Sequence, residues 1–169
     1  MTSFKVQSDN VKYTDDAIIS TYVYQDTRVE KKEGEPLIVK PIEETYMFKT
    51  ETKIPKLGLM LIGWGGNNGT TTTAGILANR HKYTWQTRNG TQTSNYFGSV
   101  TQSSTLKIGV DENGQDVFIP FHEILPMVNP NDIVVGGWDI SSLNMGDAMR
   151  RAKVLEPDLQ NQLYDEIPS

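Results

Sequence analysis

The stretch that decides the fold is residues 57–70, which read Leu57-Gly-Leu-Met-Leu-Ile-Gly-Trp-Gly-Gly-Asn-Asn-Gly-Thr70. Its first six residues are apolar apart from one glycine, as expected of a buried β-strand. The glycines that follow lack the Cβ atoms that would prevent a sharp turn or a close approach of the backbone to a phosphate. A helix that begins near Thr70 would direct its free N–H groups and the positive end of its dipole towards that phosphate. The sequence therefore predicts a strand, a phosphate-binding loop and a helix, with a nucleotide pyrophosphate as the ligand.

The glycine spacing departs from the dinucleotide-binding pattern Gly-x-Gly-x-x-Gly, because Asn68 stands where the third glycine is expected. On the glycines alone, a turn that merely closes a strand remains an alternative. A P-loop is excluded, since the loop ends Asn68-Gly69-Thr70 and has no lysine for the β- and γ-phosphates. Asn67 and Asn68 tolerate left-handed turn conformations and offer side-chain amides to phosphate or ribose oxygens.

Length and composition narrow the class of protein. The 169 residues suffice for one domain with a core, but not for a nucleotide domain plus a substrate domain. The net charge of -5, with dispersed Lys and Arg, argues against a nucleic acid partner. The chain has no cysteine, which excludes disulfides and thiolate metal sites, and we expect His81 and His122 at the surface or at helix ends rather than on a metal. The N-terminal residues lack the apolar core of a signal peptide, and no stretch reaches membrane-spanning length, so we expect a cytosolic protein without membrane contact.

The chain is expected to begin with an extended, β-rich segment, residues 1–56, followed by an α/β unit, residues 57–169. In the first segment, alternating strands are predicted around residues 21–25 and 45–49, on either side of a charged turn at 30–36. In the second, a helix near residues 70–80 is followed by an insertion at about 81–130 and then by a buried strand at 132–136. The insertion is predicted to contain two hairpins, one over 85–92 that turns at Asn89-Gly90 and one that pairs 105–110 with 117–121.

Asp139, just after the last predicted strand, is the second informative residue. In a Rossmann unit, an acid at the end of the second strand binds the adenosine ribose hydroxyls, usually about 20 residues after the glycines. Asp139 lies 73 positions beyond Gly66 (139 − 66), so this role requires the insertion. The alternative is that Asp139 caps a helix predicted over residues 143–155, a position that Ser141 or Ser142 would fill equally well. These residues by themselves favour neither interpretation.

Four longer motifs occur in the following order: residues 55–70, Asn95-Tyr-Phe-Gly-Ser-Val-Thr-Gln102, Leu125-Pro-Met-Val-Asn-Pro-Asn-Asp132, and residues 137–144 continued by 148–155. With these motifs the chain closely resembles, over essentially its whole length, the N-terminal part of the myo-inositol-1-phosphate synthase family, also called inositol-3-phosphate synthase. Thr70 is a minor departure, because the family more often has serine there; either hydroxyl can serve a phosphate or a helix start.

The resemblance implies an α/β fold: an incomplete, Rossmann-like, NAD-binding domain with a β-hairpin insertion, preceded by the β-rich segment. It implies that the loop Gly65, Gly66, Asn67 and Asn68 binds NAD and that Asp139 contacts the ribose. No arginine immediately follows the strand to receive a 2′-phosphate, so NAD is expected rather than NADP. Enzymes of this family convert glucose 6-phosphate to an inositol phosphate through oxidation by bound NAD, enolate formation, intramolecular aldol closure and reduction by the NADH formed. The complete enzyme is expected to be a homo-tetramer.

No catalytic residue is assigned within the chain. The resemblance places the family's catalytic lysines in a C-terminal substrate domain, and Lys56, Lys82, Lys107 and Lys153 match none of them. We therefore expect a fragment or a truncated product. Two alternatives remain: a non-catalytic short form that pairs with full-length subunits or sequesters NAD, and a fragment of an NAD-dependent dehydrogenase of another family.

Overall fold

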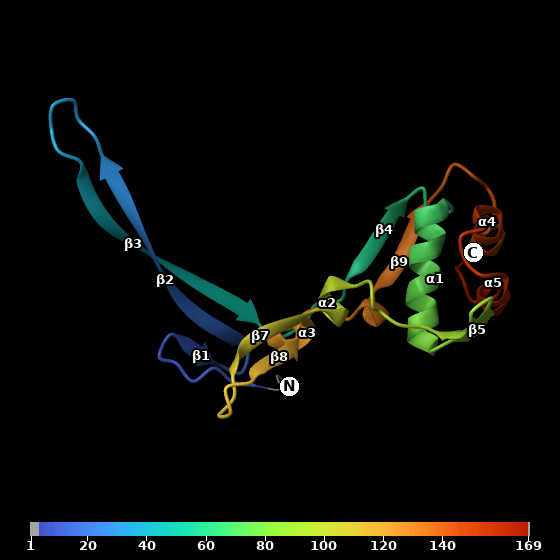
Figure 1. The fold of residues 1–169 in the computed structure, drawn as a ribbon. Helices are drawn as coiled ribbons and strands as arrows, with labels where there is room; N and C mark the ends of the chain where they lie inside the picture. Colours follow the sequence, from blue (N-terminus) through green and yellow to red (C-terminus); the bar gives the residue numbers. More distant parts are fainter. Residues whose placement is uncertain (1–3, 169) are drawn as a thin grey trace. The chain divides into compact units, whose positions relative to one another are not determined.

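The computed structural model describes residues 4–168, and the contacts among them form two units. The first comprises residues up to 54 together with 122–126. The second comprises residues 55–121 and the chain from 127 onwards. Each unit is described by itself, and Figure 1 shows the elements of both.

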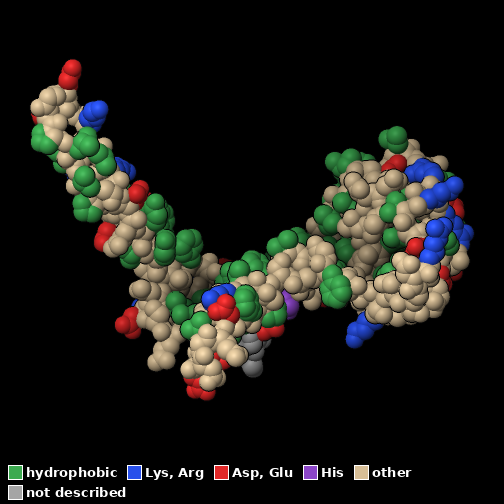
Figure 2. All heavy atoms as spheres, viewed as in Figure 1, with side chains coloured by type: hydrophobic (Ala, Val, Ile, Leu, Met, Phe, Trp, Pro, Cys, Tyr) green, Lys and Arg blue, Asp and Glu red, His purple; other side chains and the backbone are tan. Residues whose placement is uncertain are grey.

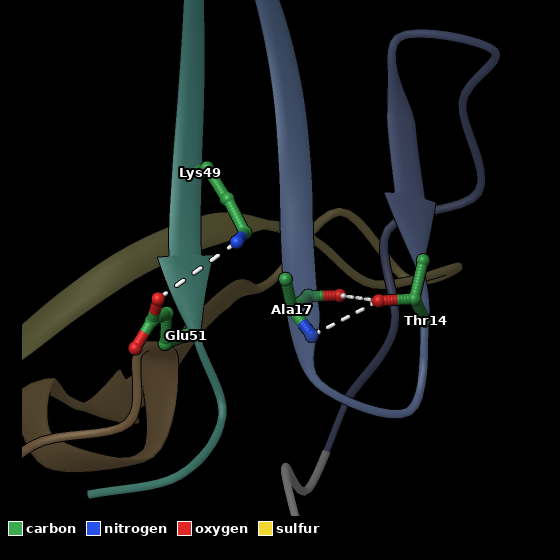
Figure 3. A network of polar contacts seen from close by, with 4 residues as sticks. All are labelled: Thr14, Ala17, Lys49 and Glu51. Carbon is green, nitrogen blue, oxygen red and sulfur yellow. Dashed lines mark hydrogen bonds and ion pairs between the residues drawn. The ribbon is translucent and has the colours of Figure 1, made fainter. Parts of the chain in front are cut away.

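The first unit is a three-stranded antiparallel sheet of β1 (Val11–Tyr13), β2 (Ala17–Glu30) and β3 (Ile38–Glu51). The strands predicted around 21–25 and 45–49 are therefore each part of a strand of 14 residues. The turn into β2 is closed by Thr14, whose Oγ1 accepts a hydrogen bond from Ala17 N and donates one to Ala17 O, both at 3.0 Å (Figure 3). On β3, Lys49 and Glu51 form an exposed ion pair with an N–O distance of 3.8 Å (Figure 3).

The long β2–β3 hairpin carries apolar side chains on both of its faces. Tyr22 and Tyr46 face each other in register, and Phe48 lies on the same face, stacked on Tyr46. Val23 and Met47 lie on the opposite face, where Met47 is 75% exposed. Hydrophobic side chains, drawn in green, are visible along the length of this hairpin in Figure 2. Alternation along the two strands thus does not produce one buried and one solvated face in the described chain.

The second unit is built on two parallel strands, β4 (Gly58–Ile62) and β9 (Val134–Trp138), paired in register from Gly58 with Val134 to Ile62 with Trp138. Helix α1 (Asn67–His81) follows β4 and lies beside the pair in Figure 1. The chain between α1 and β9 forms these elements, of which α3 lies mostly in the first unit: β5 (Thr84–Thr87), β6 (Gly90–Thr93), α2 (Val100–Ser103), β7 (Thr105–Val110), β8 (Asp116–Pro120), α3 (Phe121–Ile124) and the 3-10 turn η1 (Pro130–Asp132). Strands β5 with β6, and β7 with β8, are antiparallel hairpins at the predicted places.

Two helices complete the second unit, α4 (Met145–Ala152) and α5 (Pro157–Leu163). Its core lies between α1, α4 and α5 and consists of these buried side chains: Ala74, Leu77, Ala78, Met145, Met149, Leu159, Leu163 and Ile167. Within residues 4–168, no helix has the length and apolar character needed to cross a membrane.

Three predicted elements need correction. Helix α1 begins at Asn67 rather than near Thr70, because the chain enters the helix directly from an extended Gly66. Helix α4 is shorter than the predicted 143–155: it begins after Asn144 and ends where Lys153 takes a left-handed conformation with φ of 53°.

The third correction concerns the two parallel strands, neither of which is buried on both faces. The strand predicted at 132–136 is β9, which begins and ends two residues later. Leu59 and Leu61 are half-buried, whereas Met60 and Ile62 alternate with them and are exposed, Ile62 by 80%. Helix α1 packs on one face of the parallel pair, and within the described residues no second helix layer covers the other. An apolar run predicts a strand that can be buried on both faces, but burial also requires elements to cover them.

Candidate functional site

The glycine loop between β4 and α1 is anchored on the end of the neighbouring parallel strand. The N–H groups of Gly63 and Trp64 both donate to the carbonyl oxygen of Trp138, at 2.9 and 3.1 Å. Gly63 has a φ of 77°, which L side chains rarely adopt, and this allows the chain to turn out of β4 at that point. Because Trp138 is the last residue of β9, these bonds bring the loop against the chain that leaves β9.

The loop then leads into α1 with no side chain capping the helix. Gly66 is the N-cap residue, and its own N–H donates to Gly63 O at 2.9 Å. The carbonyl of Gly66 accepts the first helical bond, from Thr70 N, at 3.0 Å. The N–H groups of Asn67, Asn68 and Gly69 therefore precede any possible intrahelical partner, and the positive end of the helix dipole lies at the same place. This arrangement favours an anionic ligand.

Two adjoining cavities open at this point. One, of about 450 Å³, is lined by Leu61, Ile62, Gly63, Gly66, Asn67, Asn68, Gly69 and Thr72. The other, of about 640 Å³, is lined by Ile62, Gly63, Gly66, Trp138, Asp139, Ile140, Ser141 and Arg151. They share Ile62, Gly63 and Gly66, so the loop forms the boundary between a cavity at the helix start and a cavity at the end of β9.

The structure places Asp139 beside the glycine loop despite their separation in sequence. Its carboxylate lies 3.4 Å from the point that a Cβ on Gly65 would occupy. Its Oδ1 accepts a hydrogen bond from Ser141 N at 2.9 Å. Of the predicted binding residues, Gly66, Asn67 and Asn68 line the first cavity and Asp139 lines the second, whereas Gly65 is buried beneath them.

The helix-cap interpretation of Asp139 is wrong. The N-cap of α4 is Asn144, whose Oδ1 accepts from Asp147 N at 2.8 Å. Neither Ser141 nor Ser142 takes that position either. The carboxylate of Asp139 closes a turn through Ser141 instead, and so it remains in the cavity wall at the end of β9.

Sequence reasoning missed Arg151, the last-turn residue of α4 that reaches this site. Its Nη2 donates to the carbonyl oxygen of Gly65 at 2.8 Å, and its Nη1 donates to Ser141 Oγ at 3.2 Å. The available signal was the pair of basic residues at the end of α4, which suits the negative end of a helix dipole. Only the packing of α4 against the loop reveals that one of them is directed at the cavity.

The structure also explains two further residues at the start of α1, Gly69 and Thr70. A Cβ on Gly69 would lie 2.1 Å from Trp64 O. The missing side chain therefore leaves space for the carbonyl group of Trp64 and not for a phosphate. Gly137 does the same between the strands, because a Cβ there would lie 2.1 Å from Leu61 O. The hydroxyl of Thr70 is buried and donates to Gly66 O at 2.9 Å. It therefore stabilises the start of the helix and does not face a phosphate.

The site offers backbone donors, the exposed amides of Asn67 and Asn68, the carboxylate of Asp139 and, in the wall of the second cavity, the guanidinium of Arg151. Within residues 4–168, no group of three or more His, Cys, Asp or Glu side chains is placed to hold a metal ion. A phosphate at the start of α1 and a ribose near Asp139 would suit these groups. Two parallel strands joined through a glycine loop and a helix, with an acid at the end of the second strand, define a dinucleotide-binding domain of the Rossmann-like class.

Comparisons with known proteins identify the family. The family model described as myo-inositol-1-phosphate synthase, an NAD-binding model, matches residues 57–169. The chain is 57% identical over 165 residues to the inositol-3-phosphate synthase of Dictyostelium discoideum, and 54% identical over 164 residues to isozyme 2 of Arabidopsis thaliana. These matches cover 98% and 95% of this chain and 32% of each relative. A crystal structure of inositol-3-phosphate synthase from Caenorhabditis elegans matches with a TM-score of 0.90 and 43% identity, over 98% of this chain and 32% of that one.

The chain belongs to the myo-inositol-1-phosphate synthase family, and its cofactor is NAD. It spans about a third of the length of the curated relatives that it matches.

Proposed function

We propose that this chain is the NAD-binding part of an inositol-3-phosphate synthase, and that Gly65, Gly66, Asn67, Asn68 and Asp139 form its cofactor site. The observation that carries the proposal is the position of the Asp139 carboxylate, 3.4 Å from the Cβ point of Gly65, at the carboxyl ends of β4 and β9. That edge of a parallel sheet is where open α/β folds bind their ligands.

Each residue has a role that follows from its chemistry. The N–H groups of the first turn of α1 donate to the pyrophosphate, and the amides of Asn67 and Asn68 add donors at the cavity wall. Gly66 leaves the pyrophosphate free to approach the backbone. The Asp139 carboxylate accepts hydrogen bonds from the ribose hydroxyls and repels a 2′-phosphate. When bound, NAD supplies a hydride acceptor and, once reduced, a hydride donor.

The finer organisation belongs to the same proposal. Residues 57–169 form part of a Rossmann-like domain in which about 81–130 are an insertion, and residues 1–56 form a preceding β-rich segment. The complete enzyme acts on glucose 6-phosphate, assembles as a homo-tetramer and is cytosolic. The names of the relatives support the activity, and the acidic, cysteine-free composition is compatible with the location.

The chain by itself is expected to show no synthase activity. Enolate and phosphate charges need cationic partners in the transition state, and the family's catalytic lysines match no position in this chain. The test is incubation of the purified chain with glucose 6-phosphate and NAD, followed by product analysis. A chimera in which this chain replaces the matching third of the Dictyostelium enzyme serves as the positive control. Turnover by the chain above a protein-free blank would contradict this expectation.

Cofactor binding tests the site directly. We expect the chain to bind NAD in a calorimetric titration, and Gly66→Val to weaken that binding severely. The φ of Gly66, −76°, suits any residue, but a Cβ there would lie 3.1 Å from Gly63 O. Valine would therefore press on the loop backbone, and it would add bulk at a residue that lines both cavities. Gly75→Val is the matched control, because Gly75 lies on α1 and a Cβ there meets no surrounding atom within 4 Å. Equal NAD affinity in the Gly66 and Gly75 variants would show that the loop is only a turn.

A further inference from the structure

Arg151 joins the end of α4 to the two segments that form the candidate cofactor site. Its Nη2–Gly65 O bond, at 2.8 Å, is partly buried, whereas its Nη1–Ser141 Oγ bond, at 3.2 Å, is exposed. The guanidinium is planar and presents its donors in a fixed fork, so one side chain holds both acceptors in a defined relation.

The bond to Gly65 O helps to fix the orientation of the peptide group between Gly65 and Gly66, just before α1. The C=O of the peptide between Gly65 and Gly66 accepts from Arg151, and the N–H of the same peptide donates to Gly63 O at 2.9 Å. Because a peptide group is planar, bonds at both of its ends determine its orientation. Gly66 is also the N-cap of α1, so this orientation sets where the first free N–H groups of the helix point.

Charge at the helix end does not by itself explain this contact. Arg150 occupies the same last turn of α4 and gives the same dipole interaction. Its guanidinium, however, lies 3.8 Å from the centre of the Tyr164 ring and donates to Asn161 Oδ1 at 3.2 Å. The chain thus contains two neighbouring arginines of equal charge, of which Arg151 contacts the glycine loop and Arg150 contacts α5 and the residue that follows it.

We propose that Arg151 is a positioning residue that holds the glycine loop in the conformation that receives the pyrophosphate of NAD. This inference rests on the proposed function, since it concerns the same cofactor site. It assigns to Arg151 an effect on the phosphate portion of the ligand, through the backbone of Gly65, and none on the nucleoside portion. The exposed bond from Arg151 to Ser141 Oγ is secondary. Ser141 binds Asp139 through its backbone N–H, and that contact does not involve the hydroxyl.

The test compares three ligands with the 169-residue chain and its variants: NAD, ADP-ribose and adenosine. Arg151→Gln should weaken NAD and ADP-ribose roughly tenfold, the effect of losing one hydrogen bond from a charged group. Adenosine, which has no phosphate, should bind with its affinity unchanged. Arg150→Gln is the control and should bind all three ligands as the parent does. Arg151→Lys keeps the charge without the fork, and it should bind NAD less tightly than the parent.

The outcomes separate the inference from the proposed function. A parent chain that binds no NAD overturns the proposed function, and the inference with it. A parent that binds NAD while Arg151→Gln binds it equally well overturns the inference alone. Equal loss of adenosine and ADP-ribose in Arg151→Gln would reveal general damage to the fold and would also overturn it, as would full NAD affinity in Arg151→Lys.

Discussion

Two glycines of helix α1 should respond to alanine with opposite signs. Gly69 lies in the first turn, where an added Cβ would come within 2.1 Å of Trp64 O, 2.7 Å of Trp64 C and 2.8 Å of Trp64 Cα. Gly75 lies in the middle of the same helix, where an added Cβ meets no atom within 4 Å. The two substitutions are chemically identical, so they differ only in their surroundings.

The magnitude follows from the contacts. An ordinary carbon contact is about 3.5–4 Å, so alanine at position 69 requires the Trp64 backbone to move by more than about 1 Å. Overpacking of this kind costs about 1–3 kcal/mol, and the rigid backbone neighbour places Gly69→Ala near the upper end. Gly75→Ala should stabilise by about 0.5–1 kcal/mol, because alanine loses less conformational entropy in a helix than glycine. We expect the two variants to differ by about 3–4 kcal/mol in unfolding free energy.

Urea unfolding followed by tryptophan fluorescence measures this difference. The chain has three tryptophans, Trp64, Trp85 and Trp138, and all of them lie in the second unit, so the signal reports on the unit that contains α1. The comparison requires that the parent and both variants have the same dependence of unfolding free energy on urea concentration, because a changed slope indicates a change in the surface exposed on unfolding. The reasoning would be refuted if Gly69→Ala were as stable as the parent, or if Gly75→Ala were less stable than it.

Three further substitutions have defined outcomes. Asp139→Asn should lose about 1–3 kcal/mol of NAD binding and discriminate less against NADP, which parallel titrations of both cofactors would measure; unchanged affinity for both would remove Asp139 from the site. The pKa of Asp111 is lowered from 3.8, chiefly by the backbone N–H of Gln115, so its contribution to stability is present above 3.8 and is lost as the pH falls through the folded-state pKa. Asp111→Asn should therefore reduce the loss of stability on acidification below 3.8, and an unaltered acid dependence would contradict this. Tyr96→Phe removes a 2.7 Å hydrogen bond to Asn131 and should cost about 0.5–1.5 kcal/mol in urea unfolding, whereas a variant as stable as the parent would show that water replaces the bond.

The parts of the fold that were predictable are those fixed by local pattern. The Asn89-Gly90 pair predicts a hairpin through the conformation that glycine permits, and Gly90 has a φ of 106°. The turn itself lies one position earlier than predicted, at Arg88 and Asn89, because Gly90 already pairs with Thr87. The order strand, glycine loop, helix followed from an apolar run that ends in glycines. The sequence predicts the start of α1 too late, because a helix start without a capping side chain gives no sequence signal at Gly66.

What the sequence did not reveal depends on contacts between distant segments. The hydrogen bond between Arg151 and Gly65 joins residues that are 86 positions apart in the sequence. No periodicity along α4 indicates this contact. The role of Gly137 depends on the neighbouring strand, because only the pairing with β4 brings Leu61 O to its Cα. The sequence also did not indicate that the apolar side chains of the β2–β3 hairpin are exposed. Alternation assigns residues to the two faces of a strand, but it does not show what packs on each face.

The 73 positions between Gly66 and Asp139 (139 − 66) show why spacing is a weak criterion for this type of site. In a parallel pair, the register alone determines which residues meet at the carboxyl edge, and here the last pair is Ile62 with Trp138. The residues after that pair are Gly63 and Asp139, however long the chain between them is. Lengthening a connection costs little, since closure entropy grows only with the logarithm of loop length. The acid is therefore located by strand register, and a search for it in related sequences should look for the residue that follows a paired strand rather than for a fixed interval.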